Sequence, residues 1–105
     1  MEIVIHGHQT DITPSLRQRA EEGAHKLAEH LREAVDADIR FEEDGLLKTV
    51  EIVLHAPKQT RLVAKAEAKH HGPALTDAIA KLDAQIRKLK GVEKRQVHDG
   101  AELRA

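Results

Sequence analysis

Three consecutive segments in the middle of the chain alternate apolar and polar residues, and this pattern constrains the fold most strongly. They cover residues 35–42, 50–55 and 61–69. Alternation with a period of two places apolar side chains on one face of a strand and polar side chains on the other. Such regular alternation is typical of antiparallel strands with one buried and one solvated face. The pattern therefore predicts three adjacent strands, and residues 2–6 predict an earlier one.

Two segments with helical periodicity flank the three strands. The first begins at Thr13-Pro14, a capping hydroxyl followed by a proline that suits the first helical position, and it predicts a helix to about residue 32. The second begins at Gly72-Pro73 and is expected to end at Gly91, because glycine is a common helix terminator. Residues 92–105 lack a periodic apolar pattern and are predicted to form a flexible tail.

The order of these elements predicts an α+β fold, specifically a β-α-β-β-β-α two-layer sandwich. Two helices would cover one face of a four-stranded sheet, leaving the other face exposed. We expect one domain over residues 1–91 and a tail over residues 92–105. Hydrophobic residues make up 40% of the 105-residue chain, enough for one modest core, and that core must be aliphatic because Phe41 is the only aromatic residue.

Several classes of protein are excluded by composition. The chain has no cysteine and therefore no disulfide or thiolate metal site. No apolar run approaches the roughly 18–20 residues of a membrane span. The first residues show neither the charged nor the apolar region of a signal peptide, so we expect a cytoplasmic protein with no membrane partner.

Neither a metal site nor a catalytic site is predicted. The adjacent His70 and His71 would face opposite ways in extended chain, and His25 and His30 point apart on a helix, so no cofactor or metal ion is expected. The only serine is Ser15, in a first helical turn, and no glycine-rich phosphate loop occurs. Acidic residues 42–44 are interpreted as a solvated turn. We expect no enzymatic activity and no small-molecule substrate.

A net charge of −1 conceals an asymmetric distribution. Residues 1–44 hold 5 Lys or Arg against 11 Asp or Glu, whereas residues 45–98 hold 11 against 5. On the second helix, Lys81 and Lys88 flank the apolar stripe on one side, and Arg87 and Lys90 flank it on the other. With few acidic partners expected, these cations suit phosphate binding, although an ordinary solvated face is the alternative. The last strand adds Arg61, Lys65 and Lys69 without aromatic residues, which favours reading of backbone shape over base stacking.

Short pieces of the sequence resemble a known family in their order and spacing. They are Ile5-His6-Gly7, Asp11-Ile12-Thr13, Leu16-Arg17, Lys26-Leu27, Ala66-Glu67, Ala78-Ile79, Lys81-Leu82, Gln85-Ile86, Lys88 and Lys90. Over residues 1 to about 91, the chain resembles the short ribosome hibernation-promoting factors and ribosome-associated translation inhibitors, also catalogued as sigma-54 modulation proteins. The domain of that family is similar to double-stranded-RNA-binding folds.

The resemblance implies a non-enzymatic factor that binds the decoding channel of the small ribosomal subunit and blocks messenger and transfer RNA. It implies that basic helix faces contact ribosomal RNA phosphates. The matched cations are Arg17, Lys26, Lys81, Lys88 and Lys90; Lys65 and Arg87 are added from charge and placement alone. The alternative is a protein-interaction or regulatory module on the same fold that does not bind RNA.

Two differences from the family affect these expectations. Family members commonly carry Asp-Met-Tyr ahead of the second helix, where this chain has His70-His71-Gly72. The change removes a possible aromatic contact, and Pro73 alters the helix entry. Long members also carry a second, dimerising domain, which we expect to be absent because the chain ends about 14 residues past the helix. With Arg61, Lys65 and Lys69 charging the last strand, we expect a monomer off the ribosome.

Overall fold

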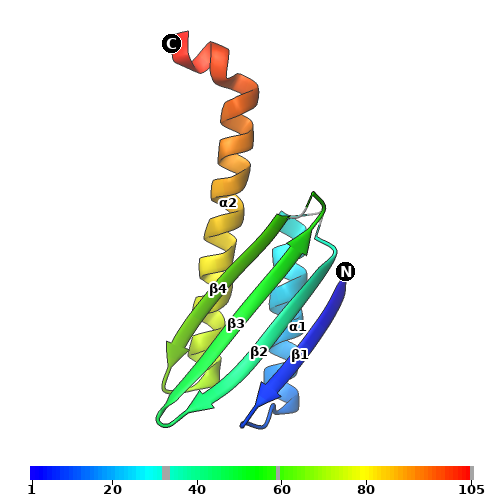
Figure 1. Ribbon diagram of the computed structural model, residues 1–105, viewed down its shortest axis with the longest axis vertical. Helices are drawn as coiled ribbons and strands as arrows, with labels where there is room; N and C mark the ends of the chain where they lie inside the picture. Colours follow the sequence, from blue (N-terminus) through cyan, green and yellow to red (C-terminus); the bar gives the residue numbers. More distant parts are fainter. Residues whose placement is uncertain (32–33, 59, 105) are drawn as a thin grey trace.

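The structure, a computed structural model, describes residues 1–31, 34–58 and 60–104, with side chains as far as Leu89. The elements are β1 (Glu2–His8), α1 (Pro14–His30), β2 (Asp36–Asp44), β3 (Leu47–Ala56), β4 (Thr60–Ala68) and α2 (His71–Arg104). The strands form one sheet in the order β1-β2-β3-β4, and both helices cover the same face of it (Figure 1). The predicted α+β sandwich is confirmed.

The strands pair in two different ways. β2 pairs with β3, and β3 with β4, in antiparallel register, as the alternating pattern predicts; Ile52 lies opposite both Ile39 and Ala64. β1 instead runs parallel to β2, with Ile5 beside Ile39. Parallel neighbours need a crossover connection, and α1 provides it. α1 lies behind β1 and β2, and α2 lies behind β3 and β4 (Figure 1).

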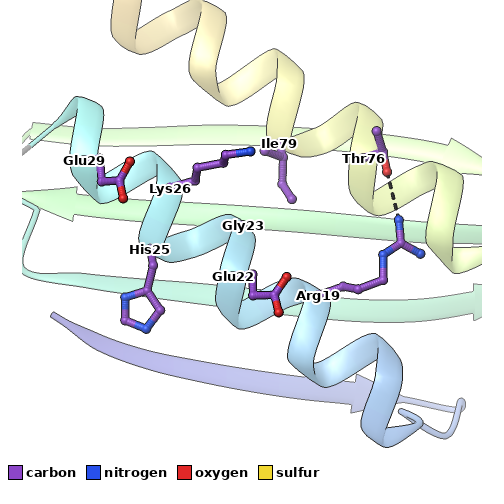
Figure 2. Close-up of a pocket in the computed structure, with 8 residues that line it drawn as sticks. All are labelled: Arg19, Glu22, Gly23, His25, Lys26, Glu29, Thr76 and Ile79. Carbon is purple, nitrogen blue, oxygen red and sulfur yellow. Dashed lines mark hydrogen bonds between the residues drawn. The ribbon is translucent and has the colours of Figure 1, made fainter.

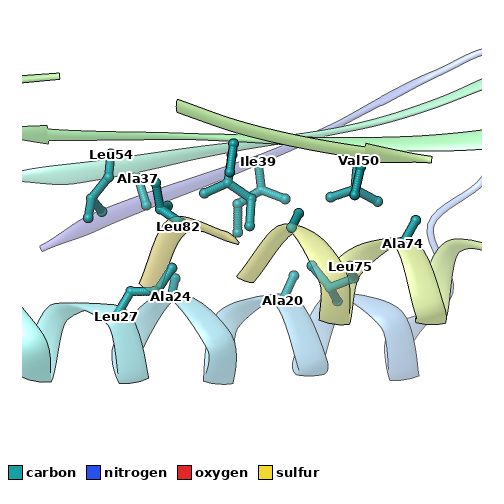
Figure 3. Close-up of a cluster of buried hydrophobic side chains, with 14 of the residues drawn as sticks. Ala20, Ala24, Leu27, Ala37, Ile39, Val50, Leu54, Ala74, Leu75 and Leu82 are labelled. Carbon is teal, nitrogen blue, oxygen red and sulfur yellow. The ribbon is translucent and has the colours of Figure 1, made fainter. Parts of the chain in front are cut away.

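The core lies between the sheet and the two helices. Alternate residues of the strands point toward the helices, and the apolar stripes of α1 and α2 point back at them (Figure 3). Aliphatic residues dominate, and Phe41 is fully buried among them, as the composition predicts. The largest fully buried side chains are Phe41, Leu27, Ile39, Ile52, Leu54, Leu75, Leu82, Ile86 and Val50.

The predicted helix start at Thr13-Pro14 is confirmed, and the predicted helix end at Gly91 is wrong. The Leu16 amide donates to Thr13 Oγ1 at 3.1 Å, which is the expected N-cap. The backbone of α2 continues past Gly91 to Arg104. A single glycine costs a helix only about 1 kcal/mol, and the following residues 92–98 contain no proline to interrupt it. The division into a 1–91 binding domain and a flexible 92–105 tail stays a prediction.

The length of α2 determines the shape of the molecule. Its 34 residues rise about 51 Å at 1.5 Å per residue, close to the 53 Å of the longest dimension. Figure 1 shows its C-terminal part extending beyond the sheet. Within the described residues, no helix combines the length and the apolar character that crossing a bilayer requires.

Candidate nucleic-acid interface

One set of candidate cations lies where α2 runs along the outer edge of β4. Lys81 Nζ donates to the backbone carbonyl of Lys65 at 3.1 Å, so lysines from two elements lie side by side. Gln85 Nε2 donates to the carbonyl of Val63 at 2.7 Å and fixes the same border. Lys88 is exposed and lies two helical turns beyond Lys81 on that flank. We call Lys65, Lys81 and Lys88 the edge group.

A second set of cations lines the groove between α1 and α2. Two hollows, of about 450 and 330 Å³, share Lys26, Thr76 and Ile79 among their lining residues and so form one continuous groove. Lys26 reaches the groove from α1, and Arg87 reaches it from α2. Figure 2 shows Lys26 beside Ile79 and Arg19 extending toward Thr76. We call Arg19, Lys26 and Arg87 the groove group.

Arg19 is a cation of this groove that sequence reasoning missed. Its Nη2 donates to Thr76 Oγ1 at 3.2 Å, and a methyl group at Gly72 would lie 2.8 Å from its Nη1. The guanidinium is therefore held against the first turns of α2. Its spacing of seven residues from Lys26 was the available signal, because seven residues make about two helical turns and return to the same face.

The expectation that the cations of α2 lack acidic partners is wrong for two of them. Arg87 Nη2 lies 2.9 Å from Asp83 Oδ2, and Lys81 Nζ lies 3.5 Å from Asp77 Oδ2. Both are pairs four residues apart with the acid on the N-terminal side, the favourable arrangement. The Lys81–Asp77 pair is exposed on both sides, and exposed pairs of this kind contribute about 0–1 kcal/mol, so a phosphate can compete with Asp77 for Lys81.

The groove carries both signs of charge. Glu22 and Glu29 line the larger hollow together with Arg19 and Lys26. At its other end, His30 Nδ1 lies 2.5 Å from Asp83 Oδ1, which links the end of α1 to the middle of α2. In the described part of the chain, the edge group has a single side-chain ion pair, that of Lys81 with Asp77. The positive charge of the edge group is therefore less compensated by acidic side chains than that of the groove group.

Two predicted residues belong to neither group. Arg17 is exposed on α1 but lies nine residues from Lys26, which is about 180° around the helix. It therefore faces away from the groove. The Lys90 side chain lies outside the described residues. Of the seven predicted cations, the structure thus brings Lys65, Lys81 and Lys88 to one border and Lys26 and Arg87 to another.

Four histidines, His6, His30, His55 and His71, are paired or packed within the fold. His6 Nε2 lies 3.0 Å from Asp38 Oδ1, and His55 Nδ1 lies 2.5 Å from Asp36 Oδ1, both on the open face of the sheet. Where the structure describes the chain, no group of three or more His, Cys, Asp or Glu side chains could hold a metal ion.

His71 occupies the junction between the β1–α1 loop and α2. Its Nε2 lies 3.1 Å from Thr10 Oγ1, and its ring meets Phe41 edge-on at 5.3 Å. Burial lowers the pKa of His71 below its ordinary value of 6.5, and the charge of Lys48 lowers it further. His71 therefore acts as a neutral packing residue, while His70 lies in the bend ahead of α2.

Comparison with known proteins places these features in a family. Residues 3–94 match the family described as Sigma 54 modulation protein / S30EA ribosomal protein. The chain belongs to this family. It is 31% identical over 98 residues to a ribosome hibernation promoting factor of Azotobacter vinelandii, with 91% of each chain covered. The match confirms the predicted resemblance and the prediction that the chain is not an enzyme.

Solved structures share the fold of this S30EA-family chain. A ribosomal subunit interface protein of Coxiella burnetii superposes with a TM-score of 0.80 at 27% identity, over 87% of this chain and 99% of that one. The N-terminal domain of Thermus thermophilus Protein Y superposes with a TM-score of 0.75 at 20% identity, over 85% of this chain and 99% of that one. The second likeness is one of fold alone.

Proposed function

We propose that this protein is a ribosome hibernation factor that occupies the decoding channel of the small ribosomal subunit. Family membership and the hibernation promoting factor of Azotobacter vinelandii support the ribosome as partner. The name of the Coxiella burnetii relative supports a site at the subunit interface. A ribosomal partner also supports the predicted cytoplasmic location. Occupation of the decoding channel and contact with ribosomal RNA are the steps that go beyond the relatives' names.

The main support for RNA binding is the position of the edge group. Lys65, Lys81 and Lys88 are exposed along one border of the molecule, and two of them are held adjacent by the bond from Lys81 to the Lys65 carbonyl. Cations at fixed positions on a rigid border suit the phosphates of folded RNA, because each contact releases a condensed counterion. The groove group, Arg19, Lys26 and Arg87, supplies a second set of cations on the other side of α2, and these can contact further RNA phosphates.

The chemistry of this interface favours contacts to the RNA backbone. Phe41 is the only Phe, Tyr or Trp in the chain, and it is 0% exposed. Bases therefore have no such ring on which to stack, and stacking is the usual means of reading single-stranded sequence. Recognition by phosphate position and overall shape remains, and it suits a factor that binds a rigid ribosomal site.

The test compares two variants that lose equal charge. The edge-group variant combines Lys65→Gln, Lys81→Gln and Lys88→Gln, and its binding to purified small subunits is measured over a range of salt concentrations. We expect the affinity to fall by at least about tenfold and the salt slope to shrink by about 2–3 units, close to one per lost phosphate contact. The control combines Arg40→Gln, Arg61→Gln and Lys58→Gln, which remove three exposed cations outside both groups.

The outcomes separate the two candidate functions. The control should bind like the parent, and both variants should unfold at nearly the parent temperature, because exposed substitutions change stability by less than about 0.5 kcal/mol. Equal binding by the edge-group variant and the parent would contradict phosphate contacts at this border. A parent that binds neither small subunits nor ribosomal RNA at low salt would instead favour the protein-interaction module.

A further inference from the structure

The turn between β2 and β3 presents two adjacent leucines to solvent. Leu46 is 90% exposed and Leu47 is 45% exposed. Hairpin turns usually carry Gly, Asn, Asp or Ser at their tips. Single exposed apolar residues are common on protein surfaces, but two neighbours at a projecting tip form a compact apolar contact. Leu46 contributes almost no buried area to the core, so folding does not account for its apolar character.

The hairpin holds these leucines in a defined position. Asp44 pairs with Leu47 across a two-residue turn, and Gly45 supplies the left-handed conformation with a φ of 62°. One register pair further along, Lys48 forms an ion pair with Glu43. A tight turn closed by a paired strand loses little conformational entropy when it binds. The leucines are therefore presented by a preorganised element.

The charge around the tip identifies the chemistry of its partner. Glu43 is paired with Lys48, and Glu42 Oε1 lies 3.9 Å from Arg40 Nη1. Residues 40–48 therefore hold two cations against three carboxylates, a net charge of −1, and Asp44 beside the turn accounts for it. Phosphate would be repelled by these carboxylates, and leucine offers RNA no hydrogen bond. An apolar anchor with an acidic surround complements an apolar pocket surrounded by Lys or Arg on a protein.

We propose that the β2–β3 turn, through Leu46 and Leu47, docks into an apolar pocket on a basic protein. Figure 1 shows the turn at the end of the sheet where α2 begins. Lys88 lies several helical turns after the start of α2 at His71. The turn and the Lys88 end of the edge group can thus contact different partners at the same time. The inference rests on the proposed function in one respect: on a ribosome, the basic protein is a ribosomal protein beside the RNA site.

The test removes the apolar character of the tip. The variant combines Leu46→Ser with Leu47→Ser, and its binding is measured both to purified small subunits and to ribosomal RNA freed of protein. We expect binding to subunits to weaken by at least about tenfold with the salt slope unchanged, because two anchoring side chains are lost but no phosphate contact. Binding to free RNA should stay at the parent level. Val35→Ser is the matched control, since Val35 is 55% exposed at the other end of β2.

A photo-cross-linking amino acid at position 46 identifies what the tip touches. Cross-linking to a ribosomal protein supports the proposal, whereas cross-linking to RNA or to a second copy of this chain overturns it. If the parent binds subunits and the double serine variant binds equally well, the proposal fails while the proposed function stands. If the parent itself binds no subunits, the proposed function fails and this inference fails with it.

Discussion

Gly23 of α1 lies directly against Ile79 of α2. A methyl group built on Gly23 would be 2.3 Å from Cδ1 of Ile79 and 3.2 Å from its Cγ1. Glycine in the middle of a helix costs about 1 kcal/mol relative to alanine, so its presence in α1 needs a compensating contact. The close approach of the helices supplies that contact, and it also sets the width of the groove that Lys26 and Ile79 line.

Gly23→Ala is therefore expected to lower the free energy of unfolding by about 1 kcal/mol, even though alanine favours the helix. Overpacking typically costs about 1–3 kcal/mol, which exceeds the gain in propensity. The measurement is urea unfolding of the single variants and of Gly23→Ala combined with Ile79→Val, which removes Cδ1. The double variant should be more stable than Gly23→Ala alone, with a coupling energy of at least about 0.5 kcal/mol. Additive effects of the two substitutions would show that this contact is unimportant.

Leu82 and Leu46 offer the same substitution at opposite extremes of burial. Leu82 is 0% exposed between the sheet and α2, whereas Leu46 is 90% exposed. We expect Leu82→Ala to cost about 2–5 kcal/mol, from lost apolar burial plus the cavity that remains. Leu46→Ala should change stability by less than about 0.5 kcal/mol. Chemical denaturation of both variants checks this, and similar losses at the two positions would contradict the assigned core.

His71 predicts a pH dependence of stability with a definite sign. Its pKa is lowered from 6.5, chiefly by burial and then by the charge of Lys48. Below pH 6.5 the unfolded chain takes up this proton more readily than the folded chain does, so acid destabilises the fold. Well above pH 6.5 the ring is neutral in both the folded and the unfolded chain, so this destabilisation is absent.

The comparison that isolates this residue is His71→Gln against the parent. We expect the parent to be the more stable of the two at a pH of about 7.5, and the difference to narrow at about 5.5, because only the parent carries the titrating ring. Urea unfolding at both pH values measures it, with His25→Gln, an exposed position, as the control. A gap that stays constant or widens in acid would show that His71 is not the responsible group.

The fold could be predicted from the sequence because its main signals are local. Alternation in residues 35–69 determines which faces are buried, and Thr13 caps α1 as its hydroxyl predicts. The parallel pairing of β1 with β2 is not a local property, because it depends on the path that α1 takes between them. The end of α2 was predicted wrongly because a glycine terminates a helix only where the following residues prefer another conformation.

The candidate site could be predicted in part. Flanks on the helical wheel separate Lys81 from Arg87 correctly, since one lies at the β4 border and the other in the groove. The spacing of four residues from Asp77 to Lys81 and from Asp83 to Arg87 was a signal for both ion pairs, and the sequence analysis did not use it. The contact of Arg19 with Thr76 could not be predicted, because the two residues are 57 positions apart in the sequence.

The covered edge of β4 leads to the last prediction, that the protein is a monomer in solution. Lys81 and Gln85 of α2 donate to the carbonyls of Lys65 and Val63, which are two residues apart and point to the same side of the strand. An edge strand with free carbonyls is a template for pairing with another chain, and capping these groups blocks it. Light scattering should therefore give a mass near 11.7 kDa over a wide range of protein concentrations.

Replacing both donors, as Lys81→Met with Gln85→Ala, should make the mass rise with concentration. The matched control is Lys88→Met with Gln18→Ala, because the Gln18 amide bonds to Glu22 on its own helix. A parent that is already dimeric would point to pairing through β1, the other edge of the sheet, and a variant as monomeric as the parent would show that the two donors do not protect β4.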